Sequence, residues 1–280
     1  MANNRIFILC LFIISIILQL GDCQLNDFVN KYFTAAEEPK ESGEWHGKWF
    51  PKRPRTSLPT DHDLYDPKHG VQMGVPSAEC DTGLMNLTID WDYNSADFTC
   101  YDNELLYAPR FDVFPISHRD HIPKSYSAAH ECMNANITYT DLIPTFGTHR
   151  PLWAKYGEYR YLPKQRWIHN LEHGSIVMLY HPCANKQEIK LLKGLVVNCL
   201  YRHVITPFRW LSPERPFALV AWGSRLLMSK IDPDIVVDFI RENALKGPEQ
   251  VSRDGQFEQQ LLRHAEVVTT IDDEKLCPRF

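Results

Sequence analysis

Three histidines and one glutamate that could bind a metal ion lie between residues 149 and 173. His149 follows a glycine-containing turn, and His169 and His173 come just before an apolar run that is typical of a core strand. These imidazoles could therefore meet at one end of a sheet, with His121 from an earlier segment as a fourth. Imidazole nitrogen is a good ligand for copper and zinc. We predict a copper or zinc site formed by His121, His149, His169 and His173, in a binding module rather than an enzyme.

The segment His169-Asn170-Leu171-Glu172-His173 also matches H-x-x-E-H, the inverted pattern of zinc peptidases. In that pattern two histidines bind zinc and the glutamate activates a water molecule. The histidines need a helix long enough to hold both rings, whereas strand-like residues follow from Ser175. A helix of about one turn is not stable by itself. A metal-dependent hydrolase with Glu172 as its base is therefore the weaker alternative, and no substrate class is indicated.

A purely structural role for these residues is the other alternative. Buried polar side chains are normally hydrogen-bonded, so the histidines could bond to the backbone at a crowded corner. Glu172 could cap a turn or pair with Arg150 or Arg166. The function would then depend on an extracellular surface that binds an unknown protein partner. The other histidines that we considered are expected at the surface or at strand ends: His118, His130, His181, His203 and His264.

The elements that would position these residues are clearest in the second half of the chain. The run Ser175–His181 is almost continuously apolar, as in a central strand. Asn185 and Asp232 are strong helix starts, and strands are expected at 204–210 and 217–228. An alternating pattern predicts an earlier strand around Leu87, Ile89 and Trp91. The element order favours an α+β fold with a mainly antiparallel sheet, helices on one face and a ferredoxin-like topology.

The first 23 residues have the features of a secretory signal peptide. Arg5 precedes an apolar run at 6–18, and small residues at Gly21 and Cys23 suit cleavage there. The run is shorter than the ~20 residues that span a bilayer, and no later segment approaches that length. An uncleaved anchor is the alternative. We predict a secreted, extracellular protein with no membrane span after the signal peptide.

Composition sets the domain boundaries and the class of partner. Residues 24–75 are polar and contain several prolines, which predicts an arm that is partly disordered. Residues 76–280 are expected to form a single α+β domain. The formal net charge is −5, and no block of lysine and arginine stands out, so we expect no nucleic-acid partner.

Cysteine usage agrees with an oxidising compartment. Without the two cysteines of the signal peptide, six remain: Cys80, Cys100, Cys132, Cys183, Cys199 and Cys277. An even number favours disulfides, and the sequence alone does not decide among their pairings. We expect Cys183 to pair with Cys199. The sequons at Asn86 and Asn136 predict a glycoprotein.

The segments 147–159 and 166–183 also resemble a known family. They are similar to the diagnostic core of the tumour protein p53-inducible protein 13-like group, part of a wider, mostly bacterial family catalogued as domain of unknown function 3105. The similarity covers residues 117–240, including Ala221-Trp222-Gly223, and fades on both sides. The resemblance implies a site shared at His149 and 169–174, and a growth-regulatory role. It implies no reaction.

Overall fold

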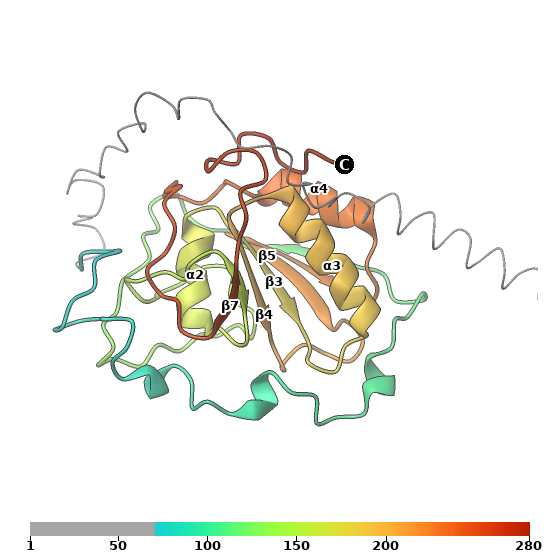
Figure 1. Ribbon diagram of the computed structural model, residues 1–280, viewed down its shortest axis with the longest axis horizontal. Helices are drawn as coiled ribbons and strands as arrows, with labels where there is room; N and C mark the ends of the chain where they lie inside the picture. Colours follow the sequence, from blue (N-terminus) through green and yellow to red (C-terminus); the bar gives the residue numbers. More distant parts are fainter. Residues whose placement is uncertain (1–70) are drawn as a thin grey trace, which may run out of the picture. The chain divides into compact units, whose positions relative to one another are not determined.

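The computed structural model describes residues 71–280, which contain a seven-stranded sheet and three α-helices (Figure 1). The strands are β1 (Ile116–Arg119), β2 (Gly157–Tyr159), β3 (Ile176–Tyr180), β4 (His203–Pro207), β5 (Phe217–Ala221), β6 (Ser224–Met228) and β7 (Leu261–His264). The helices are α2 (Lys164–Glu172), α3 (Lys186–Cys199) and α4 (Pro233–Asn243). The predicted signal peptide (1–23) and nearly all of the predicted arm (24–75) lie outside the described residues.

The sheet has the strand order β1-β6-β5-β3-β4-β2-β7. The pairs β1–β6, β5–β6, β3–β5 and β2–β7 are antiparallel, and β3–β4 and β2–β4 are parallel. The mainly antiparallel α+β fold is therefore confirmed. The ferredoxin-like topology is not confirmed. In a split βαβ unit another strand lies between the two that the helix connects, whereas α3 connects β3 to its direct neighbour β4.

Helices cover both faces of the sheet, which corrects the expectation of helices on one face. Side chains alternate between the faces along a strand. Ile176 and Met178 of β3 pack in a cluster with α3 and α4. Val177 and Leu179 pack in a second cluster with α2. Because β3 is apolar on both faces, both need a cover, and α2 supplies it on the face that the prediction left open.

The predicted starts of α3 and α4 are confirmed by side-chain capping. The side-chain oxygen Oδ1 of Asn185 accepts hydrogen bonds from the backbone amides of Gln187 and Glu188. The Asp232 carboxylate accepts from the two residues after Pro233, which occupies the first turn. Each cap satisfies amide groups that a helix start otherwise leaves without partners.

Two strand predictions are wrong in detail. Residues 217–228 form two strands rather than one, because the chain turns at Trp222 and Gly223, where Gly223 has a φ of +69°. Leu87–Ile89 form a short 3-10 helix instead of a strand. Their apolar alternation is local, and no described strand pairs with them.

The disulfides are Cys80–Cys132, Cys100–Cys183 and Cys199–Cys277. The predicted pair Cys183–Cys199 is wrong. Cys183 precedes α3 and Cys199 is its last residue, so the helix holds them roughly 20 Å apart. A disulfide needs Cα atoms within about 7 Å. Within residues 71–280, no helix is both long and apolar enough to cross a membrane.

Candidate metal centre

Helix α2 contributes two side chains to a buried polar group. It runs from Lys164 to Glu172 and is therefore longer than the single turn that the sequence predicts. His169 and Glu172 are three residues apart, so they lie on the same side of the helix. The helix ends at His173, where Gly174 has a φ of +83° and turns the chain toward β3.

Two further histidines come from extended segments that pair with each other. His130 and His149 form an isolated parallel bridge. The amide of His149 donates to Ala129, and the amide of Glu131 donates to the His149 carbonyl, at 3.0 and 2.9 Å. This pairing places two imidazoles that are distant in sequence side by side, with their ring centroids 4.8 Å apart.

His130, His149, His169 and Glu172 together form what we call the His–Glu group. Each offers one ligand atom, and these atoms all lie within 4.8 Å of one another. Four such atoms lie within about 3 Å of a common point, roughly 1 Å beyond the length of a zinc–nitrogen bond. All four residues are buried, with relative exposures from 0 to 4%. The group could hold a metal ion after small side-chain movements.

Backbone carbonyls fix the protonation of two of these imidazoles. Nδ1 of His149 donates to the carbonyl of Gly147 at 2.8 Å, and Nδ1 of His169 donates to the carbonyl of Arg150 at 2.6 Å. A carbonyl can only accept, so the proton of each neutral ring is on Nδ1 and the lone pair is on Nε2. Among the described residues, neither Nε2 atom has a hydrogen-bond partner. This arrangement orients imidazoles as metal ligands.

The surroundings keep His169 neutral. Burial, followed by the neighbouring imidazoles of His149, His173 and His130, lowers the pKa of His169 well below its usual value. A metal ligand must be unprotonated, so burial holds this ring in its binding form at neutral pH.

Glu172 lies against the histidines and not against Arg150 or Arg166, the two arginines with which the sequence predicted it could pair. Its Oε2 is 3.0 Å from Nε2 of His149, without the angle of a hydrogen bond, and 4.0 Å from Nε2 of His130. Arg150 instead binds Asp90 through two hydrogen bonds of 2.9 and 2.6 Å. Arg166 forms a buried ion pair with Asp81. Both arginines therefore pair with carboxylates other than that of Glu172.

Arg150 also holds the segment that carries His130. Its guanidinium donates to the carbonyls of Glu131, Cys132 and Ala135. The disulfide from Cys132 to Cys80 fixes the same segment from the other side. The position of His130 thus depends on interactions that are themselves buried.

The segment after α4 closes the C-terminal end of α2. A Cβ atom on Gly247 would lie 2.0 Å from the carbonyl oxygen of Glu172, so only glycine permits this approach. The amide of Glu249 donates to the Glu172 carbonyl at 3.2 Å, and the Glu249 carbonyl accepts from Nδ1 of His173 at 2.9 Å. These contacts hold the backbone of Glu172 in place.

The structure brings together two of the four residues expected to bind metal, His149 and His169. His173 lies beside the group, with its ring 4.7 Å from that of His169 and 4.6 Å from that of Trp153. Burial lowers its pKa to about 4. His121 is exposed in the segment after β1 and does not belong to the group.

Sequence reasoning assigned neither of the other two members of the group to the metal. His130 was expected at the surface or a strand end, and Glu172 as a base or a cap. The i, i+3 spacing of Glu172 from His169 could have indicated it once a longer helix was assumed. No sequence signal marks His130, because its partner segment lies some twenty residues further along the chain.

Fold and site together define a disulfide-bonded α+β protein with a buried imidazole–carboxylate group that could hold a metal ion. Residues 130–255 match the family model described as Protein of unknown function (DUF3105), so a domain of that family is found here. The match begins at His130 and includes the whole His–Glu group. No curated protein and no solved structure matches the chain.

Proposed function

We propose that the protein is a secreted metal-binding protein whose domain holds one zinc or copper ion at the His–Glu group. One observation carries the proposal. Two Nε2 lone pairs, on His149 and His169, converge with the Glu172 carboxylate in a space closed to solvent. A metal ion would satisfy both Nε2 lone pairs at once, with the carboxylate as a further ligand.

The ligand set favours zinc over copper. Three imidazoles and one carboxylate form a four-coordinate set of a kind that zinc accepts, and burial on all sides is typical of structural rather than catalytic sites. Copper(II) prefers a square-planar or tetragonal arrangement. Glu172 has the place of a ligand here, so we do not assign it the role of a hydrolytic base.

An extracellular location is part of the proposal. Three disulfides are consistent with an oxidising compartment. The sequon residues Asn86 and Asn136 are both exposed, as glycosylation requires. The signal peptide, the glycans, the growth-regulatory role and the link to the p53-inducible protein 13-like group stay predictions.

The test measures the metal content of the folded protein by mass spectrometry. We expect close to one zinc or copper ion per chain in the parent. His169→Ala should lose the ion, because it removes a member of the group. His203→Gln is the matched control, because His203 is also a buried histidine but lies outside the group, and it should keep the ion. Glu172→Gln, which preserves shape, should weaken binding by removing the charge.

Circular dichroism of each variant shows whether it folds. A folded parent that takes up neither ion from solution would overturn the proposal. Equal metal content in folded His169→Ala and parent protein would do the same. If His169→Ala does not fold, the comparison of metal content between Glu172→Gln and His203→Gln decides.

A second candidate function, an extracellular interaction protein without metal, is favoured by exposed apolar side chains between residues 105 and 114. Leu105, Phe111 and Phe114 are 81, 81 and 78% exposed, and exposed apolar groups of this kind can mark contacts with a partner. The 3.0 Å contact between the side chains of His149 and Glu172 would then be purely structural. This function predicts that a chelator changes neither the melting temperature nor the interaction.

A further inference from the structure

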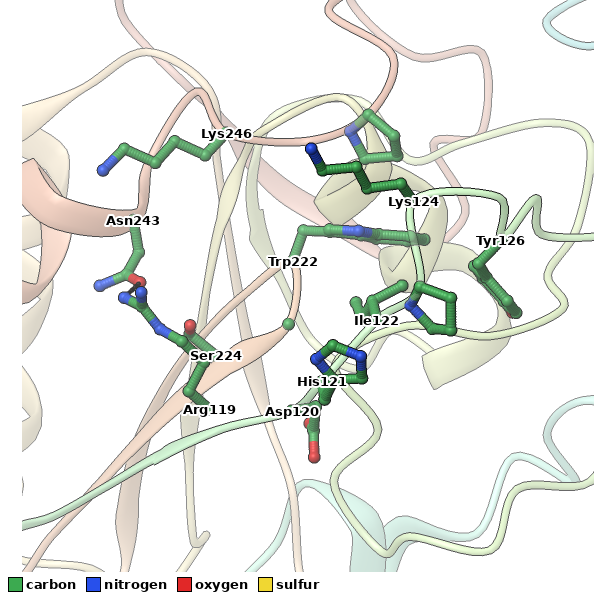
Figure 2. A pocket seen from close by; sticks show the side chains of 13 residues that line it. Arg119, Asp120, His121, Ile122, Lys124, Tyr126, Trp222, Ser224, Asn243 and Lys246 are labelled. Carbon is green, nitrogen blue, oxygen red and sulfur yellow. Dashed lines mark hydrogen bonds between the residues drawn. The ribbon is translucent and has the colours of Figure 1, made fainter.

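A cleft of about 420 Å³ lies beside the His–Glu group and is not part of it. Its walls come from the segment after β1, the β5–β6 turn, and the end of α4 with the loop that follows. Figure 2 shows Trp222 in the middle of this cleft, with Lys124 and Lys246 along one edge of the view and Arg119 beside Asn243. A volume of this size is typical of small-molecule sites.

The floor of the cleft is held rigidly by backbone hydrogen bonds among three segments. The amide of Asp120 donates to the Gly223 carbonyl at 2.9 Å, and the amide of Gly223 donates to Thr145 at 3.1 Å. A Cβ atom on Gly223 would lie 3.1 Å from Ile122. The cleft is therefore a built feature of the fold, and its hollow depends on this glycine.

Positive charge dominates the lining. Arg119, Lys124 and Lys246 all line the cleft, although the formal charge of the chain is −5. Within residues 71–280, neither lysine forms an ion pair, and Arg119 makes one hydrogen bond, to Asn243 at 3.2 Å. The guanidinium of Arg119 therefore keeps donors for a ligand.

The single carboxylate of the lining is engaged elsewhere. Asp120 accepts a hydrogen bond from the hydroxyl of Thr145, and its other oxygen lies 2.8 Å from Nε2 of His118. Its negative charge remains, so the lining carries three cations against one carboxylate. A cleft with this excess of positive charge concentrates anions from solution.

Apolar surface completes the site. The indole of Trp222 is partly exposed, and Ile122 and Tyr126 lie next to it in the lining. The rings of Tyr126 and Trp222 have their centroids 6.4 Å apart. The face of an aromatic side chain can stack on a flat ring of a ligand. The lining thus offers one surface to a ring and another to an anionic group.

We propose that this cleft binds a small organic anion, a carboxylate or phosphate attached to a flat ring, with the anionic group on Arg119, Lys124 and Lys246 and the ring on Trp222. The proposal does not depend on metal in the His–Glu group. The two sites share a wall, since Lys246 and Pro248 line the cleft while the alternate residues Gly247 and Glu249 contact the end of α2.

Binding of 2-naphthoate and 2-naphthyl phosphate to the metal-loaded protein tests the proposal by nuclear magnetic resonance. The indole N–H signal of Trp222 is identified by its absence in Trp222→Phe. At least one probe should shift this signal with saturation, with a dissociation constant on the order of 1 mM for a ligand of this size. Comparing the two shows whether the site prefers carboxylate or phosphate. Neutral 2-naphthol and inorganic phosphate should each bind at least tenfold more weakly.

The matched variants separate site binding from adsorption. The double variant Lys124→Gln with Lys246→Gln should weaken probe binding at least fivefold, and Lys190→Gln, on the exposed surface of α3, should not change it. Failure of both probes to saturate by about 20 mM would overturn the proposal. So would equal binding by the double variant and the parent. The titration is repeated after metal removal, so that binding of the probes to the cleft is judged separately from binding of metal to the His–Glu group.

Discussion

Each of the two best-defined imidazoles in the centre takes its orientation from a backbone carbonyl, not from an acidic side chain. The carbonyls of Gly147 and Arg150 accept from His149 and His169. Side-chain identity in the sequence does not reveal such partners, because every residue has a carbonyl. The sequence could therefore indicate His149 and His169 by their positions near a turn and a strand, but not the tautomer that makes them ligands.

The buried pair of Arg150 and Asp90 is the main support of the centre outside its members. The side chains are 0 and 2% exposed, and removing one partner of a buried pair leaves a charge without compensation. We expect Asp90→Asn to lower the free energy of unfolding by about 3–5 kcal/mol. It should also weaken metal binding about 10- to 100-fold, because Arg150 holds the backbone after His130.

Urea denaturation and metal competition measure the two effects. The exposed pair Arg110–Asp112 provides the control, with side chains 46 and 71% exposed. Asp112→Asn should leave both the free energy of unfolding and metal binding close to the parent values, because an exposed ion pair contributes little. If Asp90→Asn behaves like this control, the supporting role of Arg150 is wrong.

Helix α2 shows why part of the site escaped prediction. All of its residues from Gln165 to Glu172 are buried, so it lacks the exposed polar face that makes an amphipathic helix visible in a sequence. Its buried Arg166 is neutralised by Asp81, which is far away in the chain. The starts of α3 and α4, by contrast, depend on local caps and could be predicted.

Strand β4 carries a buried histidine outside the centre that makes stability depend on pH. Burial lowers the pKa of His203 to about 4, whereas the unfolded chain has the ordinary value of about 6.5. The unfolded state therefore binds a proton first as the pH falls. The contribution of neutral His203 is complete above pH 6.5 and is lost toward pH 4, by roughly 3 kcal/mol in total.

The variant His203→Gln isolates this effect, since glutamine keeps an N–H donor for the carbonyl of Leu200 and does not ionise. In excess chelator, its free energy of unfolding should fall less steeply between pH 6.5 and 4 than that of the parent. His121→Gln, at an exposed position, is the control. Parallel curves for His203→Gln and the parent would show that His203 is not the group responsible.

Three disulfides close loops of similar size over the described domain, with sequence separations of 52, 83 and 78 residues. Chain entropy alone gives each a stabilisation of about 4 kcal/mol. Only Cys80–Cys132 lies next to a member of the centre, since Cys132 is two residues from His130. We therefore expect removal of each disulfide to lower the free energy of unfolding by a similar amount but to change metal affinity to different extents.

Replacing each cystine in turn by two serines tests this distinction. All three variants should lose about 2–4 kcal/mol of unfolding free energy. Metal affinity should fall at least tenfold for Cys80→Ser with Cys132→Ser, and stay near the parent value for Cys199→Ser with Cys277→Ser. Equal loss of metal from both would mean that the disulfides act on the centre only through overall stability.

The most direct measurement of the central claim is X-ray absorption of the metal-loaded protein at the edge of the bound ion. The account predicts four nitrogen or oxygen neighbours at about 2.0–2.1 Å, with the scattering of three imidazoles, and no bound ion in folded His169→Ala. Sulfur neighbours, fewer than two imidazoles, or an unchanged spectrum in folded His169→Ala would contradict it.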